Sequence, residues 1–401
     1  MNKTQHSKKG VAFLVFLAIP LFLSVDLYNI SLSLDRFMNT WKVASTVIIL
    51  FLLVNSLIGR KKISTNILPM FVLVVVLLIS TVINDGSLGR FFTVWGGFLA
   101  VCLLVEANIR ERPLQLLLAL KISLGLILFI NFSTVLMAPE GLWRTATEGY
   151  WLLGHRNNFG APIIATIVVS VAYDLLNKGR MTFSTLLILV ASFASVMLTW
   201  SASSVVATAL VIIASLMVVF GRGIGFIKPI VLLVVYIVID IGIVFFHIQD
   251  RWSDFIENVL NRSTDLTGRT RIWGLVMDRI EESPIWGTGV QLAENNGLTQ
   301  YNANFVHAHN GELDIIFQGG FVAFIPFVVM ILMATIRADR FYSSRAVQIL
   351  FIGLILIMFR AITGLFFSSY ACLLLYLVLN SSTIWKHEPN GIGRNSALKL
   401  K

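Results

Sequence analysis

The chain has 401 residues, of which 57% are hydrophobic and only 13% are charged, and its mean hydropathy is +0.83. A water-soluble protein of this composition would lack the polar side chains needed to cover its surface, so the composition predicts an integral membrane protein. The net charge of +10 does not indicate nucleic-acid binding, because the basic residues are spread over many short segments rather than gathered in one patch.

Apolar runs follow one another along the chain. A helix needs about 20 mostly apolar residues to cross the hydrocarbon core of a bilayer, and polar or glycine-rich breaks separate the runs. We predict twelve spans, at 11–25, 43–58, 67–83, 91–105, 114–137, 161–176, 183–199, 204–220, 226–246, 315–336, 345–359 and 364–380. Only FRAITG, 359–364, separates the last two, so one kinked helix and a total of eleven spans is an alternative. The sequence thus predicts an all-α membrane protein with a single membrane domain, 1–401.

Lys and Arg predict the orientation, because short cytoplasmic loops accumulate them. With the N-terminus inside, nineteen of these residues fall in cytoplasmic segments and six in short outer loops. This asymmetry predicts that both termini are cytoplasmic and that residues 247–314 form a large extracytoplasmic loop. Cys102 and Cys372 fall inside predicted spans, where we expect neither a disulfide nor a metal site.

The long outer loop contains a helical pattern of its own. RIWGLVMDRIEE, 271–282, places Ile272, Leu275, Val276 and Ile280 on one face, and Ser283 with Pro284 ends the pattern. We therefore predict an amphipathic helix over 271–283. A helix of this kind either covers the mouth of the bundle or carries part of a functional site.

Polar residues flank this helix on both sides in the sequence. Arg269 and Arg271 precede its apolar face, and His307 with His309 follows it in NFVHAHNGELDIIFQGG, 304–320. The fork of donors on an arginine matches phosphate oxygens, and a histidine can accept a proton from an attacking hydroxyl. Together they predict group transfer from a lipid-linked pyrophosphate.

Each of these residues has a structural alternative. An arginine at the interface can simply anchor the protein in the membrane. The histidine pair has no third ligand at a recognisable spacing, so we predict no metal. Asn310, Glu312 and Asp314 can cap the next membrane helix, because its dipole favours carboxylates at that end.

Two stretches resemble the signature of the O-antigen polymerase and O-antigen ligase superfamily of bacterial membrane glycosyltransferases. They are TGRTRIWGLVMDRIEESPIWGTG, 267–289, and VHAHNGELDIIFQGGFVAF, 306–324. GHRNNFGAP, 154–162, and the Ser-rich turn WSASSVVATAL, 200–210, resemble further family motifs, so that the resemblance covers about residues 154–325. Many members carry an arginine within the Ser-rich turn, where this chain has Ser203 or Ser204. The resemblance leaves that phosphate ligand unassigned, with Arg156 or Arg144 as candidates.

The resemblance implies roles for the residues named above. Arg269 would bind the pyrophosphate of an undecaprenyl-linked glycan, and His309 would activate or position the acceptor hydroxyl. Arg271, His307, Asn310 and Trp273 would be further substrate-binding residues. It implies a fold like that of GT-C glycosyltransferases, and an inverting, metal-independent reaction without a cofactor at the outer face of the bacterial cytoplasmic membrane.

The acceptor distinguishes the possible activities. A polymerase of O-antigen, capsule or exopolysaccharide transfers the glycan to another lipid-linked repeat unit, and a ligase transfers it to lipid A core. We favour a polymerase, because no further cluster in the outer loops suits a heavily phosphorylated acceptor. A flippase and a chain-length regulator are the expected partner proteins. A polysaccharide flippase is the alternative of another class, but it should carry ionisable groups along a path through the spans.

Overall fold

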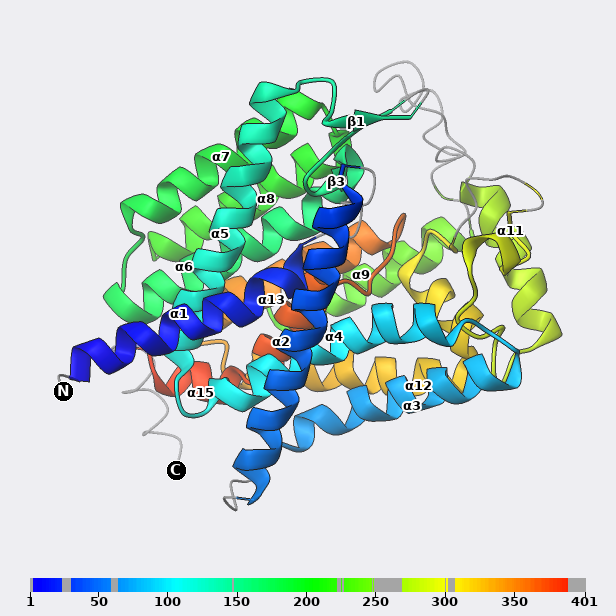
Figure 1. Cartoon of the computed structure of the whole chain (residues 1–401), viewed down its shortest axis with the longest axis horizontal. Helices are drawn as coiled ribbons and strands as arrows, with labels where there is room; N and C mark the ends of the chain where they lie inside the picture. Colours follow the sequence, from blue (N-terminus) through cyan, green and yellow to red (C-terminus); the bar gives the residue numbers. More distant parts are fainter. Residues whose placement is uncertain are drawn as a thin grey trace.

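The computed structural model describes residues 3–23, 30–58, 64–145, 148–221, 225, 227–246, 248, 269–299, 301 and 307–388, with the backbone alone for 3–7, 56, 57 and 293. The first part of the predicted outer loop, 249–268, and the segment 302–306 lie outside the described residues. Figure 1 shows a bundle of helices with a small sheet and a short helix, α11, at one end.

Each predicted span contains a helix in the described part of the chain. The helices are α1(Lys3–Phe22), α2(Leu32–Ile58), α3(Leu68–Ile83), α4(Leu88–Ile109), α5(Pro113–Met137), α6(Gly160–Lys178), α7(Phe183–Thr199), α8(Ala202–Val219), α9(Pro229–Val244), α12(Gly311–Arg340), α13(Arg345–Ala361) and α14(Ser369–Leu379). Among the described residues, seven helices are long and apolar enough to cross a membrane, and α7, α9 and α14 are shorter apolar helices. The predicted fold class, an all-α membrane protein, is confirmed. Residues 362–368 separate α13 from α14, so the two last runs are not one helix.

The remaining elements are short. A three-stranded antiparallel sheet that the sequence did not predict lies between α5 and α6, with the order β1-β2-β3. Its register pairs Trp143 with Tyr150 and Tyr150 with His155. The other elements are η2(Thr65–Ile67), β1(Trp143–Arg144), β2(Gly149–Trp151), β3(Gly154–His155), η3(Arg156–Asn158), α11(Arg269–Glu282), η5(Ala293–Asn295) and α15(Ser381–Lys386).

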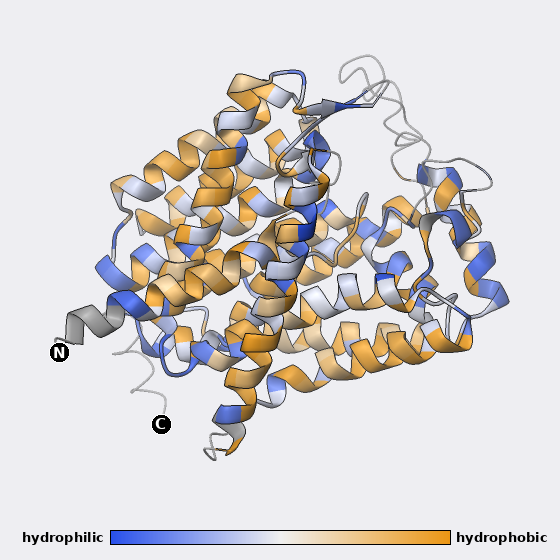
Figure 2. Cartoon of the chain, viewed as in Figure 1, coloured by the Kyte–Doolittle hydropathy of each residue, from blue (hydrophilic) through white to orange (hydrophobic). Residues whose placement is uncertain are grey.

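Helix α6 forms the centre of the bundle. Nearly all of its side chains are buried, and it packs against α5, α8 and α13. The outer helices instead expose large apolar side chains such as Val43 and Phe51, whose exposed fractions are 64% and 63%. Apolar residues extend along the helices, whereas hydrophilic ones gather toward the ends and on α11 (Figure 2). This distribution is the one that a lipid environment requires, because lipid tails cover exposed apolar surface. Cys102 and Cys372 are both buried, with free thiols.

Helix α12 is interrupted at Gly320, whose φ of 64° and ψ of −171° are not helical. The segment 284–290, which follows α11, docks into this interruption. Thr288 N donates to Phe317 O at 2.8 Å and Gly289 N to Gln318 O at 2.9 Å. Phe321 N in turn donates to Pro284 O at 2.9 Å. These bonds satisfy backbone groups that the break in the helix would otherwise leave unpaired.

The junction is closely packed around glycine. A Cβ atom on Gly320 would lie 2.0 Å from Ile285 O, and one on Gly287 would lie 2.6 Å from Gly320 N. Both glycines also have φ near +65° to +70°, which side chains disfavour. The glycine pairs in GTG, 287–289, and QGG, 318–320, therefore fit together and join α11 to α12.

Helix α11 places its apolar face on the beginning of α12. Ile272, Trp273 and Val276 are buried in one cluster with Leu313 and Phe317, and Leu275 and Ile280 pack at its margin. The face is the one that the sequence pattern predicted, and the helix begins two residues before the predicted start at 271. Packing of α11 on α12 positions Arg269, at the start of α11, relative to the residues that precede α12.

We predict that Gly320→Ala lowers the melting temperature of the purified protein much more than Gly179→Ala does. Both glycines have positive φ, so each substitution carries a backbone cost of about 1 kcal/mol, but a Cβ on Gly179 would meet nothing within 4 Å. The difference between the two melting temperatures measures the docking of the 284–290 segment. Equal losses would contradict the importance of this junction.

Candidate functional site

Several elements end together at one end of the bundle. This end holds the first turn of α12, the last turn of α13, the sheet and α11. Helix α15 and the N-terminal part of α1 lie at the opposite side (Figure 1). The motifs that the sequence analysis selected are all found at this end. The side chains between them define the candidate site.

His309 lies in a strained loop that leads into α12. Its φ is +52°, which is uncommon for a residue with a side chain. His309 N donates to His307 Nδ1 at 3.1 Å, and the two imidazole rings lie 3.8 Å apart between centroids. Ala308, between them, is fully buried and donates its N–H to Asp314 Oδ1 at 3.2 Å. The two histidines predicted for the site therefore form one contacting pair.

His307 is held in the neutral form. Burial and, to a smaller extent, the electrostatic interactions with His309, Arg90 and Arg269 lower its pKa to about 3. The hydrogen bond from His309 N to His307 Nδ1 agrees with a neutral His307, because Nδ1 of a neutral imidazole can accept a hydrogen bond. Arg269, the first residue of α11, is therefore within electrostatic range of His307.

The side chain of Asn310 is fully buried and hydrogen-bonds to three helices or their ends. Its Oδ1 accepts from Glu312 N at 3.1 Å and from Leu313 N at 2.9 Å, so it caps α12. Its Nδ2 donates to Asp240 Oδ1 at 2.9 Å and to Ile362 O at 3.2 Å. These four bonds fill the hydrogen-bonding capacity of an amide side chain. Asn310 thus joins α9, α12 and the end of α13 beneath His309.

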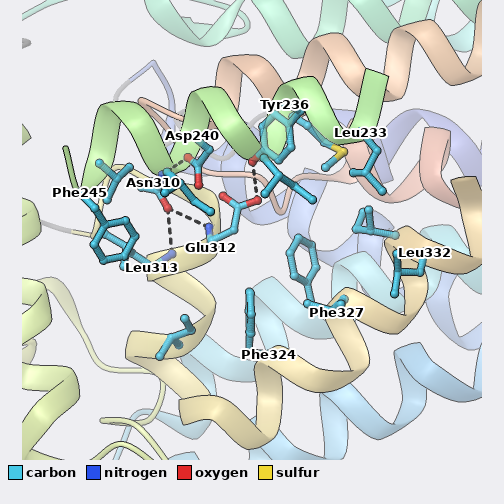
Figure 3. Close-up of a pocket in the computed structure, with 17 residues that line it drawn as sticks. Leu233, Tyr236, Asp240, Phe245, Asn310, Glu312, Leu313, Phe324, Phe327 and Leu332 are labelled. Carbon is cyan, nitrogen blue, oxygen red and sulfur yellow. Dashed lines mark hydrogen bonds between the residues drawn. The ribbon is translucent and has the colours of Figure 1, made fainter. Parts of the chain in front are cut away.

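A cavity of about 340 Å³ lies between α9 and α12, and Asn310 lines it. Figure 3 shows its polar end, where Asp240 and Tyr236 on α9 face Asn310 and Glu312. Tyr236 OH donates to Glu312 Oε1 at 2.5 Å. Most of the remaining lining is apolar, from residues such as Leu233, Phe245, Phe324, Phe327 and Leu332. The cavity therefore combines a hydrogen-bonded polar end with a long apolar part.

A second cavity, of about 160 Å³, is lined by His307. Three elements supply its other polar lining: Arg90 on α4, Gln291 and Asn296 in the segment after α11, and Asp314 and Gln318 on α12. Aromatic side chains complete the lining: Trp95, Phe98 and Phe367. Asp314 Oδ2 accepts from Gln318 Nε2 at 2.6 Å. A mixture of polar and aromatic side chains of this kind suits a sugar ring.

Arg269 is the first residue of α11 and is partly buried. Burial lowers its pKa, although a guanidinium remains charged at neutral pH because its ordinary pKa exceeds 12. Arg271 is exposed on the same helix. Trp273 is 1% exposed and its indole Nε1 has no partner among the described residues. Of these three predicted residues, Arg269 interacts electrostatically with His307, and Trp273 is buried in one cluster with Ala308, the residue between the histidines.

The GHRNNFGAP motif and the Ser-rich turn meet at η3. Asn157 Oδ1 accepts from Ser201 Oγ at 3.0 Å, which joins GHRNNFGAP to the Ser-rich turn. Ser201 Oγ in turn lies 3.0 Å from Ser204 Oγ. The backbone oxygen of Asn157 accepts a hydrogen bond from Arg360 Nη2 at the end of α13. Because Asn310 bonds to the same end of α13, all four motifs are connected through it.

Arg156 and Arg144 occupy different positions at this end. Arg156 begins η3 and is partly buried. Arg144 lies on β1 with a side chain that is 59% exposed, and it pairs with Glu140. No contact in the described part of the chain joins Arg144 to the histidine pair.

Arg360, Arg90, Asp240 and Tyr236 were not among the predicted site residues. Arg360 and Arg90 fell in short outer loops between the predicted spans, and Asp240 fell near a span end. Their sequence signal was weak, because each reaches the site through a partner distant in the chain. The partner of Arg360 lies 203 residues away.

We predict that lowering the pH from 7 to 5 lowers the melting temperature of the wild type relative to that of His307→Asn. His307 has a lower pKa folded than unfolded, so the unfolded chain binds more protons below pH 6.5 and stability falls as the pH falls. Asparagine keeps an acceptor for His309 N without titrating. The exposed His387 supplies the control, His387→Asn, which should retain the dependence. If the melting temperature of His307→Asn depends on pH as that of the wild type does, His307 is not a neutral, buried residue in the folded protein.

Comparison with known families agrees with this arrangement. A sequence model for a family described as O-antigen ligase matches residues 187–328, a stretch that runs from α7 into α12 and contains Arg269, His307 and His309. A search of curated proteins finds no match to the chain. Residues 187–328 thus match the domain of a glycosyltransferase-like enzyme family, and the match supports the O-antigen polymerase and ligase superfamily for a chain that is a membrane protein.

Proposed function

We propose that the protein is a polymerase of bacterial surface polysaccharide. It transfers a glycan from an undecaprenyl-pyrophosphate donor to a hydroxyl of another lipid-linked repeat unit. The observation that carries this proposal is the packing of α11, which begins at Arg269, against Ala308 and the beginning of α12, so that Arg269 interacts electrostatically with His307. A cation for a phosphate leaving group and a proton acceptor for an attacking hydroxyl are the two groups that such a transfer needs.

The cavities support a lipid-linked donor and a sugar acceptor. The apolar part of the larger cavity suits a prenyl chain, and its polar end adjoins Asn310, the residue after His309. The smaller cavity borders His307 and offers polar and aromatic side chains to the acceptor sugar. Donor and acceptor would then approach the histidine pair from two sides.

The proposed reaction is a single displacement. The acceptor oxygen forms a bond to the anomeric carbon of the donor glycan while the bond from that carbon to the pyrophosphate oxygen breaks. The leaving electron pair stays on the pyrophosphate, where Arg269 stabilises the charge. His309 takes the proton of the acceptor hydroxyl and then releases it to solvent. Attack opposite the leaving group inverts the anomeric centre, and no metal or cofactor enters the scheme.

Neighbouring residues position these two groups in the proposed scheme. His307 accepts a hydrogen bond from His309 N, which favours the strained backbone of His309. Asn310 ties this loop to α9 and α13, and its amide has no capacity left for substrate. Trp273 packs α11 against α12 and thereby positions Arg269. Arg271, which is exposed, would contact the glycan rather than the phosphates.

We also propose that the site faces the outside of the cytoplasmic membrane and that both termini lie in the cytoplasm. The distribution of Lys and Arg supports this orientation. In this setting a flippase would supply the lipid-linked repeat units, and a chain-length regulator would act on the product.

Two other functions compete with this one. The description of the matching family favours a ligase, which would require lipid A core as acceptor. A flippase is disfavoured by the buried ion pair of Lys121 with Asp174, at 2.7 Å, because Thr182 and Thr185 complete its hydrogen bonds. A pair satisfied in this way joins α5, α6 and α7 and offers no group to a transported substrate. Purified protein with lipid-linked repeat units alone separates a polymerase from the other two, since only a polymerase lengthens the glycan.

We predict that His309→Ala lowers the polymerisation rate by about 10²- to 10⁴-fold, the usual contribution of a general base. Lipid-linked single repeats should accumulate in cells at normal protein levels. His309→Gln separates two roles, because glutamine can orient a hydroxyl but cannot take its proton: partial activity indicates orientation, and none indicates proton transfer. His387→Ala is the matched control. Full activity in both His309 variants, or activity lost with a chelator and restored by zinc, would refute the scheme.

We predict that Arg269→Lys loses much of the activity although it keeps the positive charge, because an ammonium lacks the planar fork that binds phosphate oxygens bidentately. Arg279 on the same helix is paired with Glu282 at 2.8 Å, so Arg279→Lys is the matched control and should stay active. Gel analysis of glycan length, normalised to the amount of protein in the membrane, measures the activity of both variants. Polymer output near the wild-type level from Arg269→Ala would show that this arginine does not bind the donor.

A further inference from the structure

We infer that the smaller cavity, of about 160 Å³, takes a sugar that carries a carboxylate, a uronic acid, and that Arg90 binds this carboxylate. That this sugar is the acceptor rests on the proposed function. The preference for an acidic sugar rests instead on the side chains that line the cavity. Arg90 lines it without taking part in the proposed reaction.

Arg90 lies in the first turn of α4, and hydrogen bonds fix this turn beside the segment that follows α11. Ser87, the N-cap of α4, donates its N–H to Val290 O at 2.8 Å, and Val290 N donates to Thr81 Oγ1 at 3.1 Å. These bonds hold the beginning of α4 against the segment that contains Val290 and Gln291. Arg90 and this segment therefore line one cavity together.

The helix itself gains nothing from a cation at this position. The positive end of the helix dipole lies at the first turn, so a positively charged side chain there is unfavourable. Ser87 Oγ accepts from Arg90 N at 3.3 Å, and this cap uses the backbone of Arg90 but not its side chain. Within the described ranges the partly buried guanidinium has no hydrogen-bond partner and no ion pair. Its donors are therefore left for a ligand.

Two titratable groups lie within electrostatic range of Arg90, and neither occupies its donors. His307 is neutral, as its low pKa requires. Asp314 interacts with Arg90 electrostatically, but its oxygens have other partners: Oδ1 accepts from Ala308 N at 3.2 Å and Oδ2 from Gln318 Nε2 at 2.6 Å. The carboxylate of Asp314 thus offsets part of the positive charge without binding the guanidinium.

The unused hydrogen-bonding groups of the cavity are mainly donors. Gln318 Oε1 accepts from Trp95 Nε1 at 3.4 Å, and Asn296 Oδ1 accepts from Leu298 N at 2.8 Å. The neutral ring of His307 accepts a hydrogen bond at Nδ1, so its own proton is on Nε2. A ligand that complements this cavity must bring acceptors. A carboxylate brings two oxygens, and these match the planar fork of an arginine bidentately.

The aromatic side chains favour a sugar over a small inorganic anion. Trp95, Phe98 and Phe367 contact one another, with ring centroids 4.8 to 6.1 Å apart. Such a wall can pack against the C–H groups of a pyranose ring, whereas a phosphate ion has no apolar face to place there. Because His307 lines the same cavity and its ring contacts that of His309, a sugar bound here has its hydroxyls beside the histidine pair.

The experiment measures the binding of methyl glycosides to the full-length protein in detergent, by ligand-observed NMR titration. The probes are three matched pairs: glucuronide and glucoside, galacturonide and galactoside, and mannuronide and mannoside. The members of a pair differ only in a carboxylate against a hydroxymethyl group. We expect at least one uronide to bind about tenfold more tightly than its neutral partner, because its carboxylate forms charged hydrogen bonds. Equal binding within all three pairs would overturn the inference.

Variants of Arg90 assign the preference to this residue. Arg90→Gln should lower the affinity for the preferred uronide to that for its neutral partner and leave the neutral partner unaffected, because glutamine keeps a donor and removes the charge. Arg90→Lys should retain part of the preference. Arg36, an exposed arginine near the beginning of α2, supplies the matched control, and Arg36→Gln should retain all of it. A preference that survives in Arg90→Gln would show that another group recognises the carboxylate.

The melting temperature of the ligand-free protein separates recognition from a structural role. It should be equal or higher in Arg90→Gln, since the substitution removes a cation from the positive end of α4. A purely structural arginine predicts the opposite, namely a lower melting temperature together with weaker binding of both members of a pair. That result would also overturn the inference.

Undecaprenyl pyrophosphate tests whether Arg90 serves the donor instead. Its binding, followed by native mass spectrometry, should be equal in the wild type and in Arg90→Gln, and weaker binding to the variant would count against the acidic-sugar site. No glycan is transferred in these assays, so the two proposals can fail separately. A protein that does not lengthen lipid-linked glycans can still prefer a uronide, and equal binding within the pairs leaves the polymerase proposal standing.

Discussion

The arrangement of the candidate site depends on backbone hydrogen bonds between the 284–290 segment and the interruption of α12. These bonds allow a membrane helix to break at Gly320 without leaving its amide and carbonyl groups unpaired. They also fix where α11 lies, and with it the arginine at the start of that helix. The histidine loop is attached to the same helix from the other side, through Asn310. Two polar segments that are about 40 residues apart in the sequence are thereby held against one helix.

Charge is distributed unevenly over the described part of this site. Asp240, Glu312 and Asp314 are each bonded to a side-chain or backbone donor of the protein. None of them forms an ion pair with Arg360 among the described residues. The carboxylates therefore stabilise the loop and α12 rather than neutralising Arg360.

Local patterns in the sequence predicted most of the fold. The apolar runs gave the helices, the spacing of Ile272, Val276 and Ile280 gave the buried face of α11, and Asn310 had the residue type and position of a helix cap. These features depend on neighbours within one or two helical turns. The contact between Arg360 and Asn157, the bond of Asn310 to Asp240 and the docking of Gly287 at Gly320 depend on packing between distant segments. A single sequence carries no direct signal for such contacts, and a lone charge at a span end looks the same whether it anchors the helix or faces a site.

The burial of both cysteines has a practical consequence. Cys102 and Cys372 are each 1% exposed, inside α4 and α14, and a thiol must reach solvent as its thiolate to react with an alkylating reagent. The natural chain should thus be silent toward maleimides while it is folded. A single cysteine introduced at any exposed position would then be the one reactive thiol, and spectroscopic labels or crosslinkers can be attached without first rebuilding the interior of the bundle.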